Sequence, residues 1–191
     1  MRKTRLAVIG STNGTDLQAI IDAIGEGKLN ASVEIVISNI ANAYILERAK
    51  NHQIPNFYIS HKNKSRVSFE NEITTQIKMF KVDLILLIGF MRILSGKFCQ
   101  DWSGIILNVH PSLLPKYSGK INNNIHEEVI KNGDRETGCT VHWVTEDVDQ
   151  GKILIQKKCM VEKNDNPLSL KAKVQKLEGE ALIEAIKIFN N

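Results

Sequence analysis

The sequence predicts an α/β protein with a doubly wound, mostly parallel sheet, helices on both faces and an antiparallel edge in its C-terminal part. Short apolar runs alternate with stretches of helical period, and the run at 83–88 is almost continuously apolar, as in strands buried on both faces. After residue 135 two longer strand-like segments follow one another directly. Sheets of this class bind ligands beyond the carboxyl ends of their strands.

The elements follow in chain order. Residues 6–9 form an apolar run, and Leu17, Ile20, Ile21 and Ile24 then recur at helical spacing. The later elements that we expect are a strand at 33–37, a helix at 41–51, a short strand at 57–59, a helix at 66–80, strands at 83–88 and 105–109, strands at 139–144 and 153–161 joined by an acidic turn at 145–151, and a last helix with the apolar stripe Leu170, Val174, Leu177, Ala181, Ala185 and Ile188.

Length and composition limit the class of protein. The chain has 191 residues, 42% hydrophobic and 24% charged, which fits one globular domain over 1–191. A formal net charge of +4 is too small to indicate nucleic acid or a membrane surface as partner, and is compatible with anionic small molecules. No apolar run approaches the roughly 20 residues of a membrane span, and no signal peptide is evident. We expect a cytoplasmic monomer or homodimer that acts on small molecules.

Cysteine and histidine usage argues against disulfides and metal. Cys99, Cys139 and Cys159 are an odd number without CxxC spacing, and the five histidines have no ligand spacing with acidic or thiol residues. We therefore expect reduced thiols and no metal requirement.

The turn at 10–16, Gly-Ser-Thr-Asn-Gly-Thr-Asp, separates the first strand from the first helix. Backbone N–H groups and the positive end of a helix dipole can hold a phosphate at such a place. Thr15 with Gln18 also fits a capping box. The spacing matches neither the dinucleotide fingerprint nor a Walker A loop, so a tight turn that binds nothing is an equal alternative.

Asn108 and His110 lie at the end of a buried strand and, two residues apart, point to the same face. Asp149, in the acidic turn, is the third candidate, because a carboxylate near His110 would favour its protonated form and fix its orientation. Together the three can stabilise the oxyanion formed when an amine attacks an acyl carbon. Ser112 lacks the elbow motif of serine hydrolases, so direct transfer between two substrates is the simpler mechanism. A purely structural role for the strand pair is the alternative.

Several motifs, taken together, resemble those of a known family. They are 16–21 (Asp-Leu-Gln-Ala-Ile-Ile), 89–94 (Gly-Phe-Met-Arg-Ile-Leu), 108–117 (Asn-Val-His-Pro-Ser-Leu-Leu-Pro-Lys-Tyr), 138–142 (Gly-Cys-Thr-Val-His) and 149–151 (Asp-Gln-Gly). These motifs resemble the phosphoribosylglycinamide formyltransferase family, folate-dependent enzymes of purine synthesis. The resemblance covers essentially the whole chain and implies a formyltransferase-like variant of the Rossmann fold.

The resemblance implies a reaction and roles for its residues. A formyl group would pass from 10-formyltetrahydrofolate, as co-substrate, to the amino group of glycinamide ribonucleotide in purine (IMP) biosynthesis, through a tetrahedral oxyanion. Asn108 would bind the carbonyl oxygen, and His110 would stabilise it and donate or relay a proton. Asp149 would orient His110, and His142 resembles a histidine of the supporting shell.

The resemblance also implies binding residues. The substrate phosphate is placed on Gly14, Thr15 and Asp16, and Arg66 lies at a position near the bound substrates. The ribose and glycinamide portion is placed on Gln175 and Glu178, whose alternative interpretation is a solvated helix flank. The folate cleft is placed on Met91, Arg92, Ile93 and Leu94, which are also candidates for ordinary core packing, and on Val144, Glu146 and Asp147.

The chain departs from the family pattern in two loops. Where the family usually shows Ser-Gly-x-Gly-Ser-Asn, this chain has Ser-Thr-Asn-Gly-Thr-Asp at 11–16. Thr12 restricts the backbone and Asp16 brings a carboxylate close to the expected phosphate, which predicts weaker phosphate binding. After Tyr117, the usual Pro-Gly and histidine-bearing stretch is replaced by Ser-Gly-Lys-Ile-Asn-Asn-Asn at 118–124.

Two other functions stay open. In hydrolysis of the formylfolate, water would replace the amine, and a catalytically silent module would bind ligands without turnover. Relatives that hydrolyse the formylfolate or formylate methionyl-tRNA carry a further domain, for which we expect no room in this chain. The complete set of Asn108, His110 and Asp149 favours an active transferase over a silent module.

Overall fold

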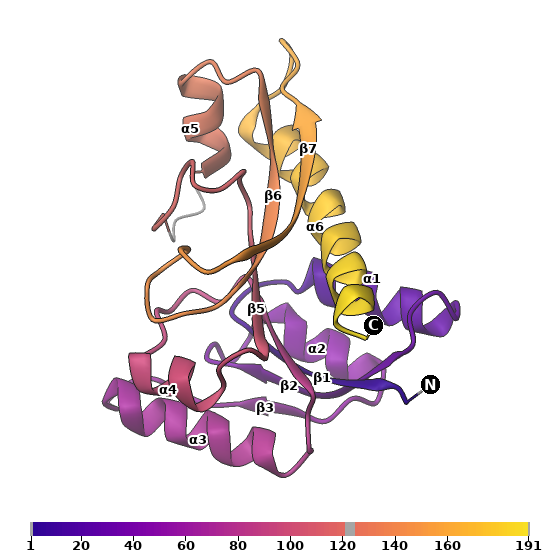
Figure 1. Ribbon diagram of the computed structural model, residues 1–191, viewed down its shortest axis with the longest axis vertical. Helices are drawn as coiled ribbons and strands as arrows, with labels where there is room; N and C mark the ends of the chain where they lie inside the picture. Colours follow the sequence, from indigo (N-terminus) through magenta and orange to yellow (C-terminus); the bar gives the residue numbers. More distant parts are fainter. Residues whose placement is uncertain (1, 121–124, 191) are drawn as a thin grey trace.

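The computed structural model of the protein describes residues 2–120 and 125–190. In this part of the chain one seven-stranded sheet has the order β3-β2-β1-β4-β5-β6-β7, with helices around it (Figure 1). The predicted fold class is confirmed. The strands are β1 (Thr4–Gly10), β2 (Ala31–Ser38), β3 (Asn56–Tyr58), β4 (Leu84–Ile88), β5 (Ile106–His110), β6 (Glu136–Trp143) and β7 (Ile153–Met160), and the helices are α1 (Thr15–Gly25), α2 (Tyr44–Asn51), α3 (Arg66–Lys78), α4 (Gly96–Asp101), α5 (Ile125–Lys131) and α6 (Pro167–Phe189).

The sheet is parallel from β3 through β5, and β6 and β7 add the antiparallel edge that the sequence predicts. Its strand order reverses at β1, which pairs with β2 on one side and β4 on the other. Because ligands of doubly wound sheets bind where the order reverses, the carboxyl ends of β1 and β4 are the expected place for a site.

Two hydrophobic clusters cover the two faces of the sheet. Successive residues of β1 point to opposite sides, so Leu6 and Val8 pack with α1, α2 and α6, whereas Ala7 and Ile9 pack with α3 and α4. All four side chains are fully buried. Burial on both faces explains why the strand is one continuous apolar run, and it holds the parallel strands as a fixed base for the loops at their ends.

The structure contains two short helices that the sequence pattern does not predict, and it shortens a third. α4 and α5 have six and seven residues, too few to display a helical period. The helix predicted at 41–51 begins at Tyr44, because the Ala43 N–H donates to the Ile40 carbonyl at 3.2 Å and closes a turn there.

The capping box predicted for the first helix is wrong. The N-cap of α1 is Gly14, in the left-handed conformation with φ of 66°, and no side chain caps the helix. Thr15 is the first helical residue, and the Gln18 amide donates instead to Asp22 at 2.8 Å. The first turn of α1 therefore keeps its backbone N–H groups free of a side-chain cap.

Helix α6 follows its predicted stripe except at the end, where Ile188 is exposed and Leu182 and Ile186 are buried instead. The buried face of α6 packs closely against α1, and a Cβ on Gly179 would lie 2.8 Å from the Cβ of Ala19. This approach brings the first turn of α1 beside the middle of α6. Even the 23-residue α6 falls short of the apolarity needed to cross a bilayer, as do the other helices in the described residues.

The end of the loop from β6 to β7 packs against Trp143, the last residue of β6. A Cβ on Gly151 would overlap the Trp143 carbonyl oxygen, and the Trp143 N–H donates to the Lys152 carbonyl at 3.0 Å. The loop starts beside β5, where the Val144 N–H donates to the Ile106 carbonyl at 2.9 Å. A glycine at 151 is thus what lets the loop close and return along β5.

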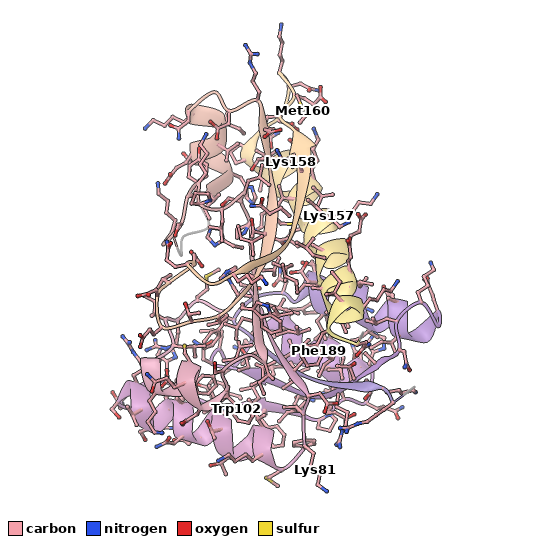
Figure 2. The ribbon with its side chains drawn as sticks, viewed as in Figure 1. Lys81, Trp102, Lys157, Lys158, Met160 and Phe189 are labelled. Carbon is pink, nitrogen blue, oxygen red and sulfur yellow. The ribbon has the colours of Figure 1, made fainter. Side chains whose placement is uncertain are left out.

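Strand β7 forms one edge of the sheet, and lysines occupy both of its faces. Lys157 pairs with Glu184 of α6 at 2.9 Å, and Lys158 pairs with Glu136 of β6 at 2.9 Å. Figure 2 shows Lys157 beside α6, with Lys158 and Met160 farther along the strand. Charged side chains on an edge strand disfavour pairing with a foreign strand.

We predict that Gly179→Ala destabilises the protein relative to Gly25→Ala by about 1–3 kcal/mol, the usual cost of overpacking. Both substitutions replace a helical glycine and gain the same kind of helix propensity, up to about 1 kcal/mol. A Cβ at Gly25 meets nothing within 4 Å, whereas at Gly179 it meets the rigid Cβ of Ala19. Urea unfolding of the two variants measures the difference, and equal midpoints would contradict the proposed close contact.

Candidate active site

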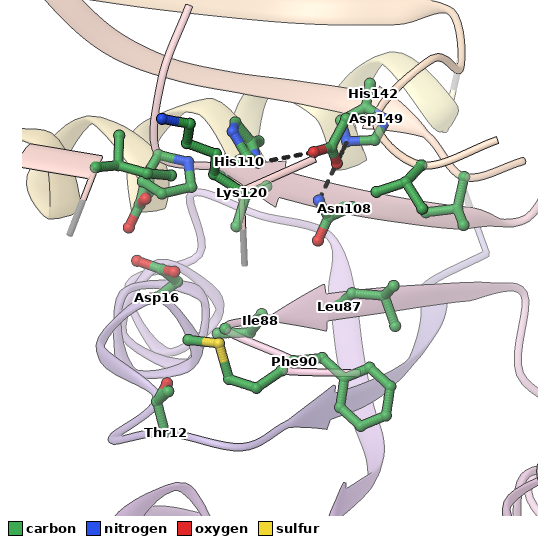
Figure 3. A pocket seen from close by; sticks show the side chains of 18 of the residues that line it. Thr12, Asp16, Leu87, Ile88, Phe90, Asn108, His110, Lys120, His142 and Asp149 are labelled. Carbon is green, nitrogen blue, oxygen red and sulfur yellow. Dashed lines mark hydrogen bonds and ion pairs between the residues drawn. The ribbon is translucent and has the colours of Figure 1, made fainter. Parts of the chain in front are cut away.

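A cavity opens at the carboxyl ends of β4 and β5 and the loop that follows β1, where the fold class predicts it. The β6–β7 loop and α6 complete its walls, and Figure 3 shows part of its lining. Of the site residues expected from the sequence, Gly14 and Arg66 do not line it. Those that line it are Thr15, Asp16, Met91, Arg92, Ile93, Leu94, Asn108, His110, Val144, Glu146, Asp147, Asp149, Gln175 and Glu178.

Strand β5 places Asn108 and His110 on one face at its carboxyl end, and the antiparallel pairing with β6 sets His142 opposite Asn108. The Asn108 Nδ2 lies 3.1 Å from the His142 Nε2, and the His142 Nδ1 lies 3.0 Å from the Trp143 carbonyl oxygen. Because a carbonyl only accepts, Nδ1 carries the hydrogen, and in the neutral ring Nε2 accepts from Asn108. One amide hydrogen of Asn108 is used in this way, and the second remains for a ligand.

Asp149 reaches the same place from the β6–β7 loop. Its Oδ2 lies 3.4 Å from the His110 Nδ1 and accepts a hydrogen bond from the Gly119 N–H at 2.8 Å, and its Oδ1 lies 3.6 Å from the His142 Nε2. The backbone of Asp149 is left-handed, with φ of 57°, a strained conformation for a residue other than glycine. Figure 3 shows Asn108, His110 and Asp149 gathered at one side of the cavity.

Burial decides the charge of His110. Desolvation lowers the pKa of His110 below 6.5, although the Asp149 charge and the Tyr117 carbonyl, 3.2 Å from Nε2, act to raise it. The sequence argument predicts a protonated ring beside Asp149. The structure differs because the cost of burying the imidazolium exceeds the attraction of one carboxylate.

Asp149 keeps its charge in the same surroundings. Burial acts to raise the pKa of Asp149, but the nearby His142, the charge that His110 carries when protonated and the Gly119 N–H together lower it by more, so the pKa lies below 3.8. At neutral pH the free site therefore holds an ionised carboxylate beside a neutral imidazole. A carboxylate in this state can accept a proton.

The loop after β1 is compressed between two elements. At Gly14 a Cβ would lie 2.5 Å from Ile45 Cγ1, and at Gly89 a Cβ would overlap Thr12 Oγ1. Gly14 does not line the cavity, but its lack of a side chain lets the loop pack against Ile45. The Thr12 side chain packs directly against Gly89. The Met91 N–H donates to the Ser11 hydroxyl oxygen at 3.0 Å and ties this loop to the segment after β4.

Two buried carboxyl groups lie in another wall of the cavity, where α1 meets α6. Asp16 is 4% exposed and Glu178 is 8% exposed. Burial raises the pKa of Asp16 to about 7. Burial and the nearby Asp16 raise the pKa of Glu178 well above its ordinary value, against the opposing charge of Lys171. At neutral pH this wall therefore holds fewer charges than its two acids suggest.

Three titratable residues of the lining are not among the site residues expected from the sequence: Lys120, His126 and Lys171. His126 is buried, its Nδ1 has no hydrogen-bond partner among the described residues, and burial together with Lys171 lowers its pKa to about 4. Its helix, α5, has no periodic signal. For Lys171 a signal exists, because it shares one helix flank with Gln175 and Glu178 at spacings of four and seven residues.

The segment after β4 is hydrogen-bonded to α3. Buried Glu70 accepts hydrogen bonds from the Ser95 hydroxyl and, at 2.7 Å, from the Ser95 N–H. Leu94 packs in the core, so core packing is the better description of that residue. Met91 and Ile93 are 38% and 43% exposed and line the cavity, where they offer apolar surface to a ligand.

Arg66 and the loop at 118–124 fit the expectations least. Arg66 is exposed at the start of α3, away from the cavity lining, and its role stays a prediction. Residues 121–124 lie outside the described residues. The rest of the altered loop contributes Lys120 to the lining and the Gly119 N–H to Asp149, so the departure from the family pattern leaves this support of Asp149 in place.

Within residues 2–120 and 125–190 no group of three or more His, Cys, Asp or Glu side chains is arranged to hold a metal ion. Cys99, Cys139 and Cys159 are free thiols.

The fold and the amide–imidazole–carboxylate cluster define a class of protein, the formyl transferases, and the model of the formyl transferase family matches residues 4–186. A phosphoribosylglycinamide formyltransferase of Haemophilus influenzae is 42% identical over 186 residues, which are 97% of this chain and 86% of that protein. The chain belongs to the formyl transferase family, and within it to the phosphoribosylglycinamide formyltransferases. The resemblance seen in the motifs is confirmed.

Other relatives agree with this assignment. The human trifunctional purine biosynthetic protein adenosine-3 is 42% identical over 188 residues, and the chain spans 18% of the length of that relative. The solved structure of the phosphoribosylglycinamide formyltransferase from Coxiella burnetii matches with a TM-score of 0.92 at 41% identity. The match covers 98% of this chain and 87% of the Coxiella burnetii chain.

We predict that Asp149→Asn lowers the pKa of His110 further below 6.5, because the carboxylate that opposes the effect of burial is lost while the shape of the side chain is kept. Titration of the imidazole signals by NMR measures the shift, with His110 assigned by substitution. Asp147→Asn, which removes an exposed acid of the same loop, is the matched control and should leave the ring unchanged. A wild-type ring that titrates above 6.5, or one insensitive to Asp149→Asn, would contradict this account.

Proposed function

We propose that this protein transfers the formyl group of 10-formyltetrahydrofolate to the amino group of glycinamide ribonucleotide in purine (IMP) biosynthesis. The observation that carries the proposal is the convergence of Asn108, His110 and Asp149 at one side of a single cavity. The Haemophilus influenzae relative, whose name gives phosphoribosylglycinamide as the group that is formylated, supports the choice of acceptor. The proposal includes a cytoplasmic location, a monomer or homodimer, and no nucleic-acid or membrane partner.

The folate would lie between the segment after β4 and the β6–β7 loop. A flat heteroaromatic ring needs apolar walls with a few fixed polar groups. Met91 and Ile93 provide the apolar wall on one side, and Val144 with the polar backbone that follows it provides the other. The Arg92 guanidinium stays 5.7 Å from the centre of the Phe69 ring, so its charge is held beside α3 rather than placed in the middle of the cleft.

The nucleotide would occupy the wall formed by α1 and α6. Its phosphate would face the uncapped first turn of α1 at Thr15 and Asp16, where backbone N–H groups and the helix dipole favour an anion. Gln175 and Glu178 on α6 would meet the ribose and glycinamide portion. This arrangement directs the amino group toward Asn108 and His110.

The chemical step needs no covalent enzyme intermediate. The amine nitrogen attacks the formyl carbon, and the carbonyl π electrons move to oxygen, where the free amide hydrogen of Asn108 and the His110 ring stabilise the charge. When the intermediate collapses, the bond from carbon to N10 of the folate breaks, N10 takes up a proton and the attacking nitrogen gives one up. Ionised Asp149 accepts this proton, directly or through water, and His110 relays it.

The neutral state of His110 suits this role. The charge of the oxyanion appears only during the reaction, and a negative charge beside the ring favours its protonated form. The interaction therefore strengthens as the transition state forms, which is the condition for catalysis. Ser112 takes no part, because its hydroxyl is buried and donates to the Lys116 carbonyl at 2.6 Å.

We predict that the purified chain deformylates 10-formyltetrahydrofolate only when glycinamide ribonucleotide is present, followed by absorbance of the folate. The fixed amide and imidazole act on an oxyanion that requires the amine in place. Consumption of the folate without the amine would favour hydrolysis instead. Absence of turnover, with both ligands bound in calorimetry, would favour a silent binding module.

We predict that His110→Ala, Asn108→Ala or Asp149→Ala each lowers kcat by about 10²–10⁴, the usual contribution of an oxyanion donor or a general acid–base group. Glycinamide ribonucleotide binding by calorimetry should persist, because the nucleotide wall is separate from these residues. Ser112→Ala is the matched control and should retain kcat within about an order of magnitude, since its hydroxyl makes only a structural bond. Full activity of His110→Ala would contradict the mechanism.

A further inference from the structure

The wall between α1 and α6 holds a buried carboxyl group whose state the formyl-transfer chemistry does not explain. Asp16 is 4% exposed, and its Oδ1 has no hydrogen-bond partner among the described residues. Buried polar atoms are nearly always paired, and an ionised oxygen without partner or water is far more costly than a protonated one. The carboxyl group nevertheless lines the ligand cavity, and Figure 3 shows Asp16 across this cavity from His110 and Lys120.

A second acid faces Asp16 because of the helix contact described above. Gly179 lets α6 approach Ala19 of α1, and Asp16 lies three residues before Ala19 on the same helix face. Glu178 precedes Gly179, is also buried, and lies close enough to Asp16 for the Asp16 charge to oppose its ionisation. Two carboxylates in one poorly solvated place cannot both ionise cheaply, so the pair keeps at least one proton.

The charges of the surrounding groups do not compensate for the cost of ionising both carboxyl groups. In the described residues no cation lies within 4 Å of either carboxyl group. Lys171 on α6 acts on Glu178 from farther away, and His126 on α5 is neutral, with a pKa near 4. Arg48 on α2 is held by the Asn13 carbonyl at 2.7 Å and the Gln18 amide at 3.1 Å. Cys139 on β6 is a neutral thiol whose pKa burial raises to about 12.

We propose that Asp16 and Glu178 do not ionise together, and that the phosphate of the nucleotide binds only when Asp16 is neutral, so that Asp16 is a proton-dependent determinant of substrate binding. This inference rests on the proposed function, which places the phosphate at Thr15 and Asp16. A phosphate monoester carries up to two negative charges at neutral pH. An ionised Asp16 in the same turn would repel it through a medium of low dielectric constant, whereas a protonated carboxyl can donate a hydrogen bond.

The raised pKa of Asp16, about 7, agrees with this arrangement. Near neutral pH the group is partly ionised in the free protein, and binding of the phosphate would draw a proton from solution. Above pH 7 the apparent affinity should then fall as the neutral fraction falls, approaching tenfold per pH unit. The phosphate itself keeps a constant charge between pH 7 and 8.5, since its second pKa is about 6.

The test compares the wild-type chain with Asp16→Asn, which keeps the shape of the side chain, cannot ionise and retains a hydrogen-bond donor. Glycinamide ribonucleotide binding is measured by calorimetry at pH 7 and 8.5, in buffers of different ionisation enthalpy. We expect the wild-type affinity to fall by roughly tenfold or more over this range, with uptake of up to one proton. Asp16→Asn should bind with equal affinity at both values and take up no proton.

A second measurement needs no ligand. NMR titration of the side-chain carboxyl carbons should show Asp16 titrating near pH 7, and Asp16→Asn should move the midpoint of Glu178 to lower pH, because the opposing charge is gone. A Glu178 midpoint that Asp16→Asn leaves in place would contradict the coupling of the two acids. Ribose 5-phosphate serves as a second probe of the phosphate contact.

The outcomes separate the two proposals. An Asp16 carboxyl that titrates below pH 5 overturns the protonated state of Asp16, whatever the chain binds. Wild-type affinity that is equal at pH 7 and 8.5, or that changes in the same way in Asp16→Asn, overturns the link to phosphate. A raised titration with no nucleotide binding by either protein contradicts the proposed function, and the phosphate contact with it.

Discussion

The antiparallel pairing of β5 with β6 is the interaction on which the site depends. It sets His142 opposite Asn108 and leaves β6 to end beside the start of β5. The loop that follows must then return along β5 to reach its carboxyl end, and Gly151 lets it close against Trp143. Asp149 arrives between two histidines as a consequence of this path, and its left-handed backbone is the strain that the path imposes.

Poor solvation acts on the acids and the base of this cavity in opposite directions. It makes His110 neutral and raises the pKa of Asp16, since each group avoids the charged form. Asp149 differs because a backbone N–H donates to its Oδ2 and two imidazole rings, which can be protonated, lie within 3.6 Å of its oxygens. The polar groups around a carboxyl, rather than its burial alone, therefore decide which acid of the site carries charge.

The sequence predicts those parts of the fold that show a repeated signal over enough residues. The parallel strands do, because burial on both faces makes them continuously apolar. β6 is predicted to start at 139 but starts at Glu136, since Thr137 and Gly138 carry no apolar pattern, and α4 and α5 are too short for a period. The convergence of Asn108 with His110 follows from strand alternation. Neither strand alternation nor any residue spacing singles out Asp149 among the acids of its turn. Only the family resemblance does so.

The protonation of the site lies beyond sequence reasoning for a different reason. The charge of His110 is a balance between burial and two nearby acceptors, and only the packed structure shows which is larger. The same holds for Asp16, whose neighbour Glu178 is more than 160 residues away in the chain. A pattern can nominate titratable residues, but it cannot give the solvation that sets their charge.

The departures from the family pattern fall where the structure can tolerate them. Asn108, His142 and Asp149 are joined by hydrogen bonds or close charge contacts, so a change in one leaves the others with buried groups unpaired. The turn at the start of α1, where we propose that the phosphate binds, offers uncapped backbone N–H groups and keeps Gly14 as glycine. Side chains such as Thr12 and Asp16 can change there without removing the backbone donors. Under the proposed function they act on the strength and proton dependence of binding, and the groups at the opposite side of the cavity are left unchanged.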